Sequence, residues 1–330
     1  MAIQDKAQVG FKTESTYGTA VTVDRFLEFS GEEIMPDRQT IRSSGMRSGM
    51  RTHRTDRFVQ YTRKVSGPLK VQPLSKGFGW WLNHMLGSSA TGSTVDSATT
   101  HTGTFGSLYN KSFTLQSNRA FNPGNGDQAF TWAGCKIASW DVACAVGQLL
   151  EFNLNIVGQS ETTGTALATA SYPTGTVEPF SFVGGSVTVA GSSYEVGGFK
   201  LSCDNALKVD NQKLKSTGAI NQPVEEGLRV INWALDDGDF VDLTQYNRFM
   251  SATASGALAT MVATFVAPTL IGVSSLPTIT ITVDNAHFEQ GSGMNAGGPG
   301  VTMQSFGGAG LWDGTDSPIT IAYKTADTTA

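Results

Sequence analysis

The chain offers few side chains whose type and spacing match a known catalytic or metal site. Its four histidines are scattered, and none has a second metal-ligating residue at the spacing that such sites use. They are His53, His84, His101 and His287. The sequence contains neither a G-x-x-x-x-G-K phosphate loop nor a G-x-S-x-G nucleophile motif. We therefore expect no enzyme activity, no catalytic residues, no metal ion and no cofactor.

Three weaker signals have plainer interpretations. Residues 291–296 match G-x-G-x-x-A by letters, but no helix or downstream acid is evident, so a flexible connection is expected. Asp236, Asp237 and Asp239 are expected to form a solvated turn or a charged contact surface, because acidic spacing alone does not define a calcium site. His84 falls on a helical pattern and is expected at a surface or interface.

The basic loop at residues 39–57 is different in kind. It carries arginines at short spacing and two adaptable methionines, namely Arg42, Met46, Arg47, Met50, Arg51, Arg54 and Arg57. Three interpretations are open: a mobile solvated loop, a phosphate-binding strip, or an arm that becomes ordered against a neighbouring subunit. The arm is favoured because arginine pairs well with carboxylates, which the rest of the chain holds in excess.

Charge is distributed unevenly. Residues 1–72 hold 12 Lys and Arg against 8 Asp and Glu, whereas the remainder holds 11 against 20. This split favours contact between a basic segment and the acidic surface of another copy, and it disfavours a general nucleic-acid binder. No apolar run is long enough for a membrane helix, no signal peptide is evident, and the three cysteines fit buried free thiols in a reducing compartment.

Period-two alternation dominates the chain, as in half-buried antiparallel sheets. It predicts strands over residues 149–157, 185–190, 199–203, 258–267, 278–284 and 318–324. A helix is predicted after Ser75, as its cap, and before Gly87, with a counterpart around residues 242–254.

A short motif occurs twice. Residues 37–45 read DRQTIRSSG and residues 210–218 read DNQKLKSTG, and each is followed by a strand and then a helix. We therefore expect a mainly β chain of two similar domains, residues 1–160 and 177–330, joined by a polar linker at 161–176. The long arginine-rich loop is expected in the first copy only, since the second continues with AINQPVEEG.

Several longer segments resemble the tail tube, or major tail, proteins of long-tailed bacteriophages, in the larger form of that family. They are GFKTESTYGTAVTVDRFLEFSGEEI, DRFVQYTRKVSGPLKV, KGFGWWLNHMLG, TWAGCKIASWDVACAVGQLLEFNLNIVG and GGFKLSCDNALKVD. The resemblance implies β-sandwich or barrel domains with a flanking helix, and subunits that stack as rings into a hollow tube. Because family loops and terminal arms lock one ring to the next, it also implies that residues 39–57 form an inter-subunit or inter-ring arm. It also implies a virion location, assembly in the host cytoplasm, DNA passage without specific binding, and tape-measure, tail-tip and tail-terminator proteins as partners.

Two further expectations follow from the resemblance and the repeat together. Three chains could supply six tube domains, which gives a trimeric ring with pseudo-sixfold symmetry in preference to a hexamer. The polar faces of two predicted strands are the candidates for the lumen wall: Glu151, Asn153, Asn155, Thr280, Thr282 and Asp284. An outer, solvent-facing position for these residues is an equally open alternative.

Other functions are weighed against this one. Another self-assembling protein, such as a capsid decoration or pilus-like subunit, would show the same strand patterns. A carbohydrate-binding or hydrolytic β-sandwich would need exposed aromatic side chains or a convergent acid–base pair. The tryptophans are expected mostly in the core, and no spacing suggests such a pair.

Overall fold

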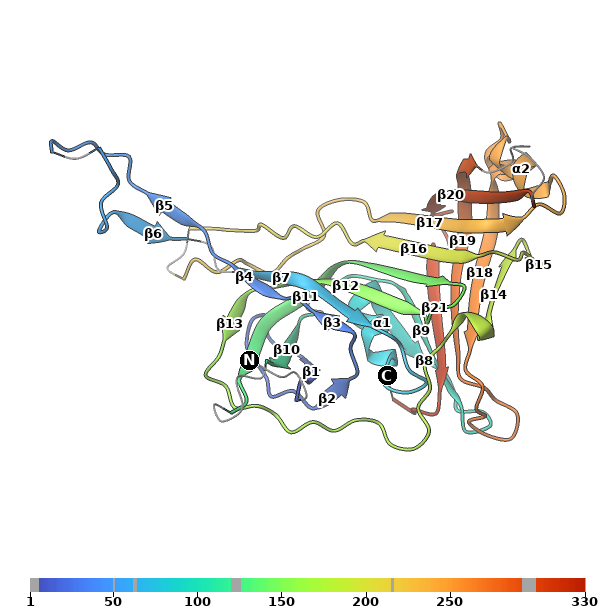
Figure 1. Ribbon diagram of the computed structural model, residues 1–330, viewed down its shortest axis with the longest axis horizontal. Helices are drawn as coiled ribbons and strands as arrows, with labels where there is room; N and C mark the ends of the chain where they lie inside the picture. The colour runs from blue at the N-terminus through green and yellow to red at the C-terminus, as the bar shows by residue number, and fades with distance from the viewer. Residues whose placement is uncertain are drawn as a thin grey trace.

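The computed structural model describes residues 6–49, 51–61, 64–119, 126–214, 217–292 and 301–329. The fold consists mainly of antiparallel strands, as the sequence predicts, and a hairpin arm reaches away from one end of the body (Figure 1). Among the described residues, no helix has the length and apolar character needed to cross a membrane.

The elements before residue 163 form a first set. They are β1 (Val9–Thr13), β2 (Arg25–Leu27), β3 (Gly31–Glu32), β4 (Met35–Asp37), β5 (Thr40–Arg42), β6 (Phe58–Gln60), β7 (Lys64–Val71), α1 (Gly79–Leu86), β8 (Gly87–Thr91), β9 (Thr99–Phe105), β10 (Phe113–Asn118), β11 (Ala129–Ala145), β12 (Glu151–Gly158) and β13 (Ser160–Thr162).

The elements after residue 181 form a second set. They are a 3-10 turn (Phe182–Gly184), β14 (Gly185–Val189), β15 (Ser192–Ser193), β16 (Gly198–Asp204), β17 (Val230–Asp239), α2 (Thr244–Phe249), α3 (Ala254–Ala257), β18 (Leu258–Val266), β19 (Thr278–Ser292), β20 (Met303–Leu311) and β21 (Ile319–Thr325). All six strands predicted by alternation are present.

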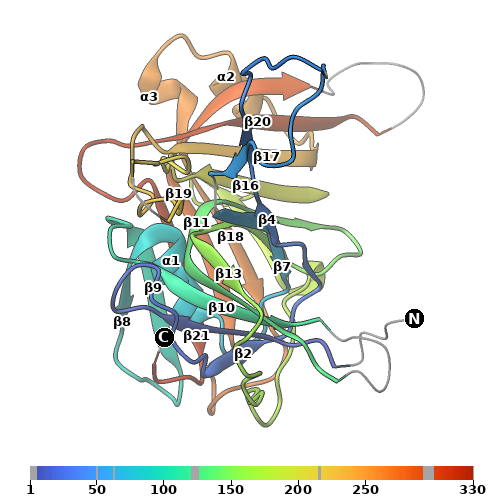
Figure 2. The same cartoon turned by 90° about the vertical axis from the view of Figure 1, so that its left-hand side faces the viewer.

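One large sheet runs through both sets. Its strands pair in the order β4, β7, β12, β11, β16, β17, β20 and β19, and β3 lies beside β4 along β7. We call it the eight-stranded sheet. Figure 1 shows the strands in this order from β7 to β20, and β11, β16, β17 and β20 follow one another in Figure 2 as well.

A second sheet crosses the first. It contains β14, β18, the first part of β19, β21, β9 and β8 in that order. A smaller group of strands, β2, β1, β10 and β13, surrounds the first part of β11. The long strands β11 and β19 therefore each belong to two sheets.

The pairing pattern of the first set recurs in the second. β11 pairs with β10, β12 and β13, and β19 pairs with β18, β20 and β21. β10 also pairs with β1, just as β18 pairs with β14. On the other side, β12 is followed by β7 and then β4, just as β20 is followed by β17 and then β16. Within the described part of the second set, no hairpin corresponds to that of β8 and β9, and β9 pairs with β21.

The pairing register differs from the register of the repeated motif. Gly31–Asp37 lies along β7 from Lys70 to Lys64, and Gly198–Asp204 lies along β17 from Asp236 to Val230. Asp37 thus corresponds to Asp204, whereas the sequence motif aligned it with Asp210. The motif therefore lies in the same connection in both sets, but the alignment by motif differs from the alignment by strand pairing by six residues.

The two connections after these strands have nearly the same length. They span residues 38–63 in the first set and 205–229 in the second. The expectation of a long loop in the first copy only is therefore wrong. What differs is conformation: the first connection forms the arm, whereas the second packs on the body near its two ends, at Asn205 and at residues 220–223.

The helix α1 is buried between the sheets. It begins after Phe78, and it ends at Gly87, whose φ of 95° suits glycine. Ser75 does not cap it, because the Ser75 hydroxyl accepts a hydrogen bond from the Glu178 amide instead. The counterpart α2 is present, as predicted, but shorter.

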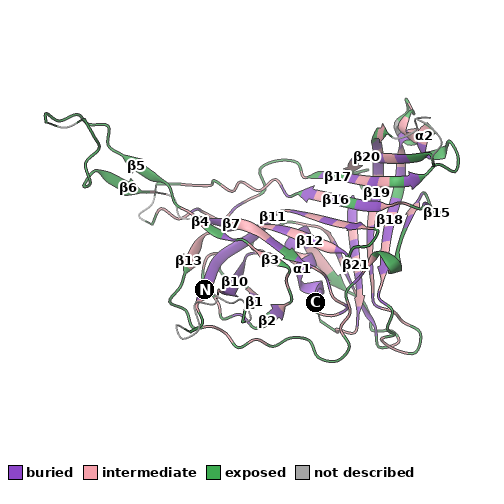
Figure 3. Cartoon of the chain, in the orientation of Figure 1, coloured by how far each residue is buried: buried purple, intermediate pink, exposed green. Residues whose placement is uncertain are grey.

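The core lies between the sheets and is built from the inward faces of their strands (Figure 3). Trp81, Trp132 and Trp140 are fully buried, and Trp80 and Trp233 nearly so, as expected for core tryptophans. Trp312 is the exception and is 68% exposed. The three cysteines are buried free thiols, as the sequence predicts.

Candidate assembly surfaces

The arm is an exposed hairpin. β5 pairs with β6 through Thr40 and Gln60, Ile41 and Val59, and Arg42 and Phe58. Every described residue from 38 to 60 is exposed (Figure 3). Met50, one of the predicted contact residues, lies outside the described residues.

Charge and apolar surface coincide on this arm. The predicted contact residues Arg42, Arg47, Arg51, Arg54 and Arg57 all lie on it, with Asp56 as its one carboxylate. Arg54 donates two hydrogen bonds to Asp56, at 2.9 and 3.2 Å, and these lower the pKa of that carboxyl. Large apolar side chains are exposed beside these charges: Ile41, Met46, Phe58 and Val59. An exposed surface of this composition is typical of an interaction site.

The eight-stranded sheet has a polar face. On β12, Glu151, Asn153 and Asn155 alternate with the buried Phe152, Leu154 and Ile156. These three predicted residues therefore share one face of one strand, opposite the core.

Neighbouring strands continue that face with hydrogen-bonded polar pairs. The Asn153 amide donates to Asp141 on β11 at 3.1 Å, and the Asn155 amide donates to Ser139 at 3.0 Å. Burial raises the pKa of Asp141 above its usual value. The side chains of this face are thus mostly tied to one another.

The face is acidic on balance. Between Gly31 and β17 it carries six carboxylates, on Glu33, Asp37, Asp141, Glu151, Asp204 and Asp236. It carries three amines, on Lys64, Lys70 and Lys200. Two of these are paired, Lys64 with Asp37 at 3.3 Å and Lys200 with Asp236 at 2.6 Å. The unpaired excess is therefore negative.

The other three lumen candidates lie elsewhere. Thr280, Thr282 and Asp284 are on the first part of β19, where the neighbours are β18 and β21 of the second sheet. Burial raises the pKa of Asp284, and the nearby Asp316 and Asp313 raise it further. The structure does not bring the two predicted groups onto one sheet.

The expectation for His84 is wrong. Its side chain is buried, with Nδ1 at 3.0 Å from the Lys111 carbonyl and Nε2 at 3.1 Å from the Thr13 hydroxyl. Burial lowers its pKa to about 4. His84 belongs to the packing of α1, because the helix is covered on almost every side rather than on one stripe.

The acidic cluster forms no metal-binding constellation. Asp236 pairs with Lys200, and Asp237 has a φ of 50° where β17 and β20 slip in register. Among the described residues, no group of three or more His, Cys, Asp and Glu side chains is arranged to hold a metal ion. The glycine-rich match includes residues 293–296, which lie outside the described residues.

A buried lysine had no signal in the sequence. Lys136 on β11 is 2% exposed, and its Nζ donates to the carbonyls of Leu108 at 2.7 Å and Pro223 at 2.9 Å. Burial lowers its pKa to about 8. Lys136 thus joins the first set to the connection at 205–229.

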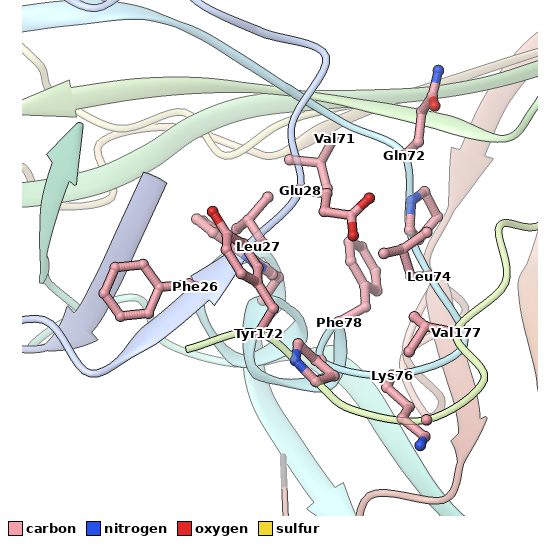
Figure 4. Close-up of a pocket in the computed structure, with 15 residues that line it drawn as sticks. Phe26, Leu27, Glu28, Val71, Gln72, Leu74, Lys76, Phe78, Tyr172 and Val177 are labelled. Atoms are coloured by element: carbon pink, nitrogen blue, oxygen red, sulfur yellow. The ribbon is translucent and has the colours of Figure 1, made fainter. Parts of the chain in front are cut away.

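A pocket of about 280 Å³ opens between β2, the turn before α1, and residues 172–177 (Figure 4). Apolar residues such as Phe26, Leu74 and Tyr172 line it together with polar groups, and its charged side chains are Glu28 and Lys76. The Lys76 amine donates to the Thr174 carbonyl at 2.7 Å. The pocket contains no paired nucleophile and base, and it suggests no reaction.

Comparison with known proteins agrees with the sequence resemblance. No curated protein sequence matches the chain. A family model described as phage tail tube protein matches residues 4–310, which is nearly the whole chain. The chain therefore belongs to the phage tail tube protein family.

Proposed function

We propose that this protein polymerises as stacked rings into the hollow tail tube of a bacteriophage, through which genomic DNA reaches the bacterial host. Family membership supports a structural protein of the virion tail. The observation that carries the assembly proposal is the eight-stranded sheet, whose ends are only partly covered within the described residues. At one end β3 and β4 pair only with β7, and at the other β19 pairs with β18 as far as His287 but with no strand beyond it on that edge. Joining these ends around a ring would cover both edges, which an unassembled chain leaves exposed.

The ring would contain three chains. Residues 1–160 and 177–330 act as two tube domains joined at 161–176, and each supplies four strands to the eight-stranded sheet. Three chains then provide six equivalent groups of strands with pseudo-sixfold symmetry. Closed cyclic symmetry is the common outcome for such head-to-tail contacts.

The polar face of the eight-stranded sheet would line the lumen. A DNA conduit should not retain its cargo, and a face with excess carboxylates and few free amines repels the phosphate backbone. This assignment keeps Glu151, Asn153 and Asn155 as lumen residues. It places Thr280, Thr282 and Asp284 outside the lumen, because they lie on the second sheet.

The arm would connect neighbouring subunits. Its arginines and exposed apolar side chains suit the carboxylate-rich surface of another copy. Assembly would take place in the host cytoplasm, around the tape-measure protein and between the tail-tip and tail-terminator proteins.

Electron microscopy of the purified protein tests this function. We expect hollow tubes or rings that show three-fold symmetry with six lobes when viewed end-on. Rings of six whole chains would be consistent with the tube but would exclude the trimeric ring. A protein that stays monomeric even with tail tips added as seeds would overturn the proposal.

A further inference from the structure

The connection at residues 205–229 packs on the first set of elements. The Asn205 side-chain amide donates to the carbonyls of Met85 at 3.1 Å and Ile137 at 3.0 Å. The Arg229 guanidinium donates to the carbonyls of Leu86 at 3.1 Å and Gly106 at 2.6 Å. The connection thus caps the end of α1 and the middle of β11.

More contacts extend this covered surface. Lys136 donates to the Pro223 carbonyl, and the Gln159 amide donates to the Ile220 carbonyl at 2.8 Å. The covered side chains are almost inaccessible: Met85 and Leu86 are 0% exposed and Lys136 is 2% exposed. We call this the covered surface of the first set.

The second set has a corresponding surface without a cover. The register slip between β11 and β12 follows Ile137, and the slip between β19 and β20 follows Phe288. This aligns Lys136 with His287 and places the end of α2 and the end of β20 around it. Here Met250 is 59%, Leu311 41% and Trp312 68% exposed. We call this the open surface.

The arm is the connection that packs on no surface of its own chain. It occupies the position in the first set that residues 205–229 occupy in the second, and it has nearly the same length. Yet all its described residues from 38 to 60 are exposed. Within one chain, therefore, the arm packs on nothing, and the open surface is covered by nothing that the structure describes.

Their charges are complementary. The arm carries arginines with Asp56 as its one carboxylate. Four carboxylates, on Glu289, Asp313, Asp316 and Asp284, lie on or beside the open surface, where Glu289 contacts His287 and Arg248 is the nearby cation. Apolar side chains accompany the charges on both, such as Phe58 on the arm and Trp312 on the open surface. Aromatic and arginine side chains are the usual energetic centres of protein interfaces.

We propose that the arm of one chain packs on the open surface of the next chain in the same ring. We expect this contact between chains to resemble the contact within the chain, between residues 205–229 and the covered surface. The inference rests on the proposed ring, and it names the surfaces through which the ring closes.

Side chains rather than a strand ladder must provide most of this contact. The outward Ile34 amide already donates to Glu32 at 2.6 Å, and the Ile34 carbonyl accepts from Arg119 at 2.6 Å. Pro36 has no N–H to donate. The edge of β3 and β4 therefore offers few free backbone groups, and the arm beyond it becomes the main attachment.

A photo-crosslinking residue at position 312 tests the contact. We replace Trp312 with benzoylphenylalanine, which keeps a large aromatic group at an exposed position, and irradiate assembled protein. The expected product joins position 312 of one chain to residues 38–61 of another, identified by mass spectrometry. On a denaturing gel the ladder of products should end at three chains, because the contact closes within one ring.

Matched controls separate this contact from the proposed function. Benzoylphenylalanine at Val95, which is also 68% exposed but lies on the β8–β9 loop, should give no adduct with residues 38–61. Tubes that form without the adduct from position 312 would overturn the contact and leave the tube function standing. A ladder that continues beyond three chains would place the arm between rings and also overturn it. Absence of rings and tubes from the unmodified protein, even with tail tips added as seeds, would overturn both.

Discussion

Asp37 and Asp204 occupy the same place in two copies of one strand arrangement. Asp37 ends β4 opposite Lys64, the first residue of β7, and Asp204 ends β16 opposite Val230, the first residue of β17. From these two points the chain takes different courses, into the arm and onto the body. The repeat is thus preserved in strand pairing and broken in the connections after these two strands.

Lysines on the polar face should make the tube retain DNA. We expect the double variant Asn153→Lys and Asn155→Lys to assemble normally but to bind DNA, with an affinity that falls steeply as salt is raised. The control is Thr280→Lys with Thr282→Lys, which adds the same charge to the second sheet. Binding measured in assembled tubes at several salt concentrations separates the two. Equal retention by both variants would refute the lumen assignment.

Removing charge from the arm should weaken assembly. The triple variant Arg47→Gln, Arg51→Gln and Arg54→Gln should raise the concentration needed for polymerisation, because these exposed side chains lose their carboxylate partners on another chain. The same number of charges removed elsewhere, by Lys6→Gln, Lys208→Gln and Lys213→Gln, should have little effect. Light scattering during assembly measures both, and similar behaviour of the two variants would argue against the arm.

Two ion pairs should differ greatly in their contribution to the free energy of unfolding. Arg119 bonds to Glu32 at 2.8 Å, where the carboxylate side chain is only 4% exposed, and it also lies over the Phe130 ring. Arg119→Gln should lower the free energy of unfolding by about 3–5 kcal/mol, because it leaves a buried charge unpaired. Lys12→Gln breaks an exposed pair with Asp24 and should cost at most about 1 kcal/mol. Urea unfolding of both variants gives the comparison, and a small loss for Arg119→Gln would contradict it.

Stability should fall on acidification because of His84. Its pKa is about 4 in the folded protein, against 6.5 as its ordinary value, so the unfolded chain takes up a proton first. This contribution to stability is complete above pH 6.5 and is lost progressively between 6.5 and 4. His84→Asn should therefore flatten the dependence of unfolding free energy on pH in this window. His53→Asn, at an exposed position on the arm, should leave the dependence unchanged, and an equal change in both would exclude His84 as the cause.

Local patterns in the sequence predicted the strands well and their partners poorly. The alternation around Phe152 and Ile281 identifies one face of each strand, because successive side chains point to opposite sides. It does not identify the neighbouring strand, so Thr280 and Asn153 looked equivalent although they lie on different sheets.

The candidate site shows the same limit. The arginines of the arm are adjacent in sequence, and their grouping was visible there. Lys136 was not, because its partners at Leu108 and Pro223 come from distant segments. His84 was misplaced for the related reason that helical spacing gives no information about how many sides of a helix are covered.

The pairing of β9 with β21 has a consequence for synthesis on the ribosome. β9 ends at Phe105 and its partner begins at Ile319, so this edge of β9 has no partner until residues 106–318 have been synthesised. At about 5–20 residues per second, that interval lasts on the order of 10–40 s. Throughout this time a nascent chain could pair with the wrong neighbour on the same messenger. Synthesis of β21 is therefore the step that covers this edge of β9.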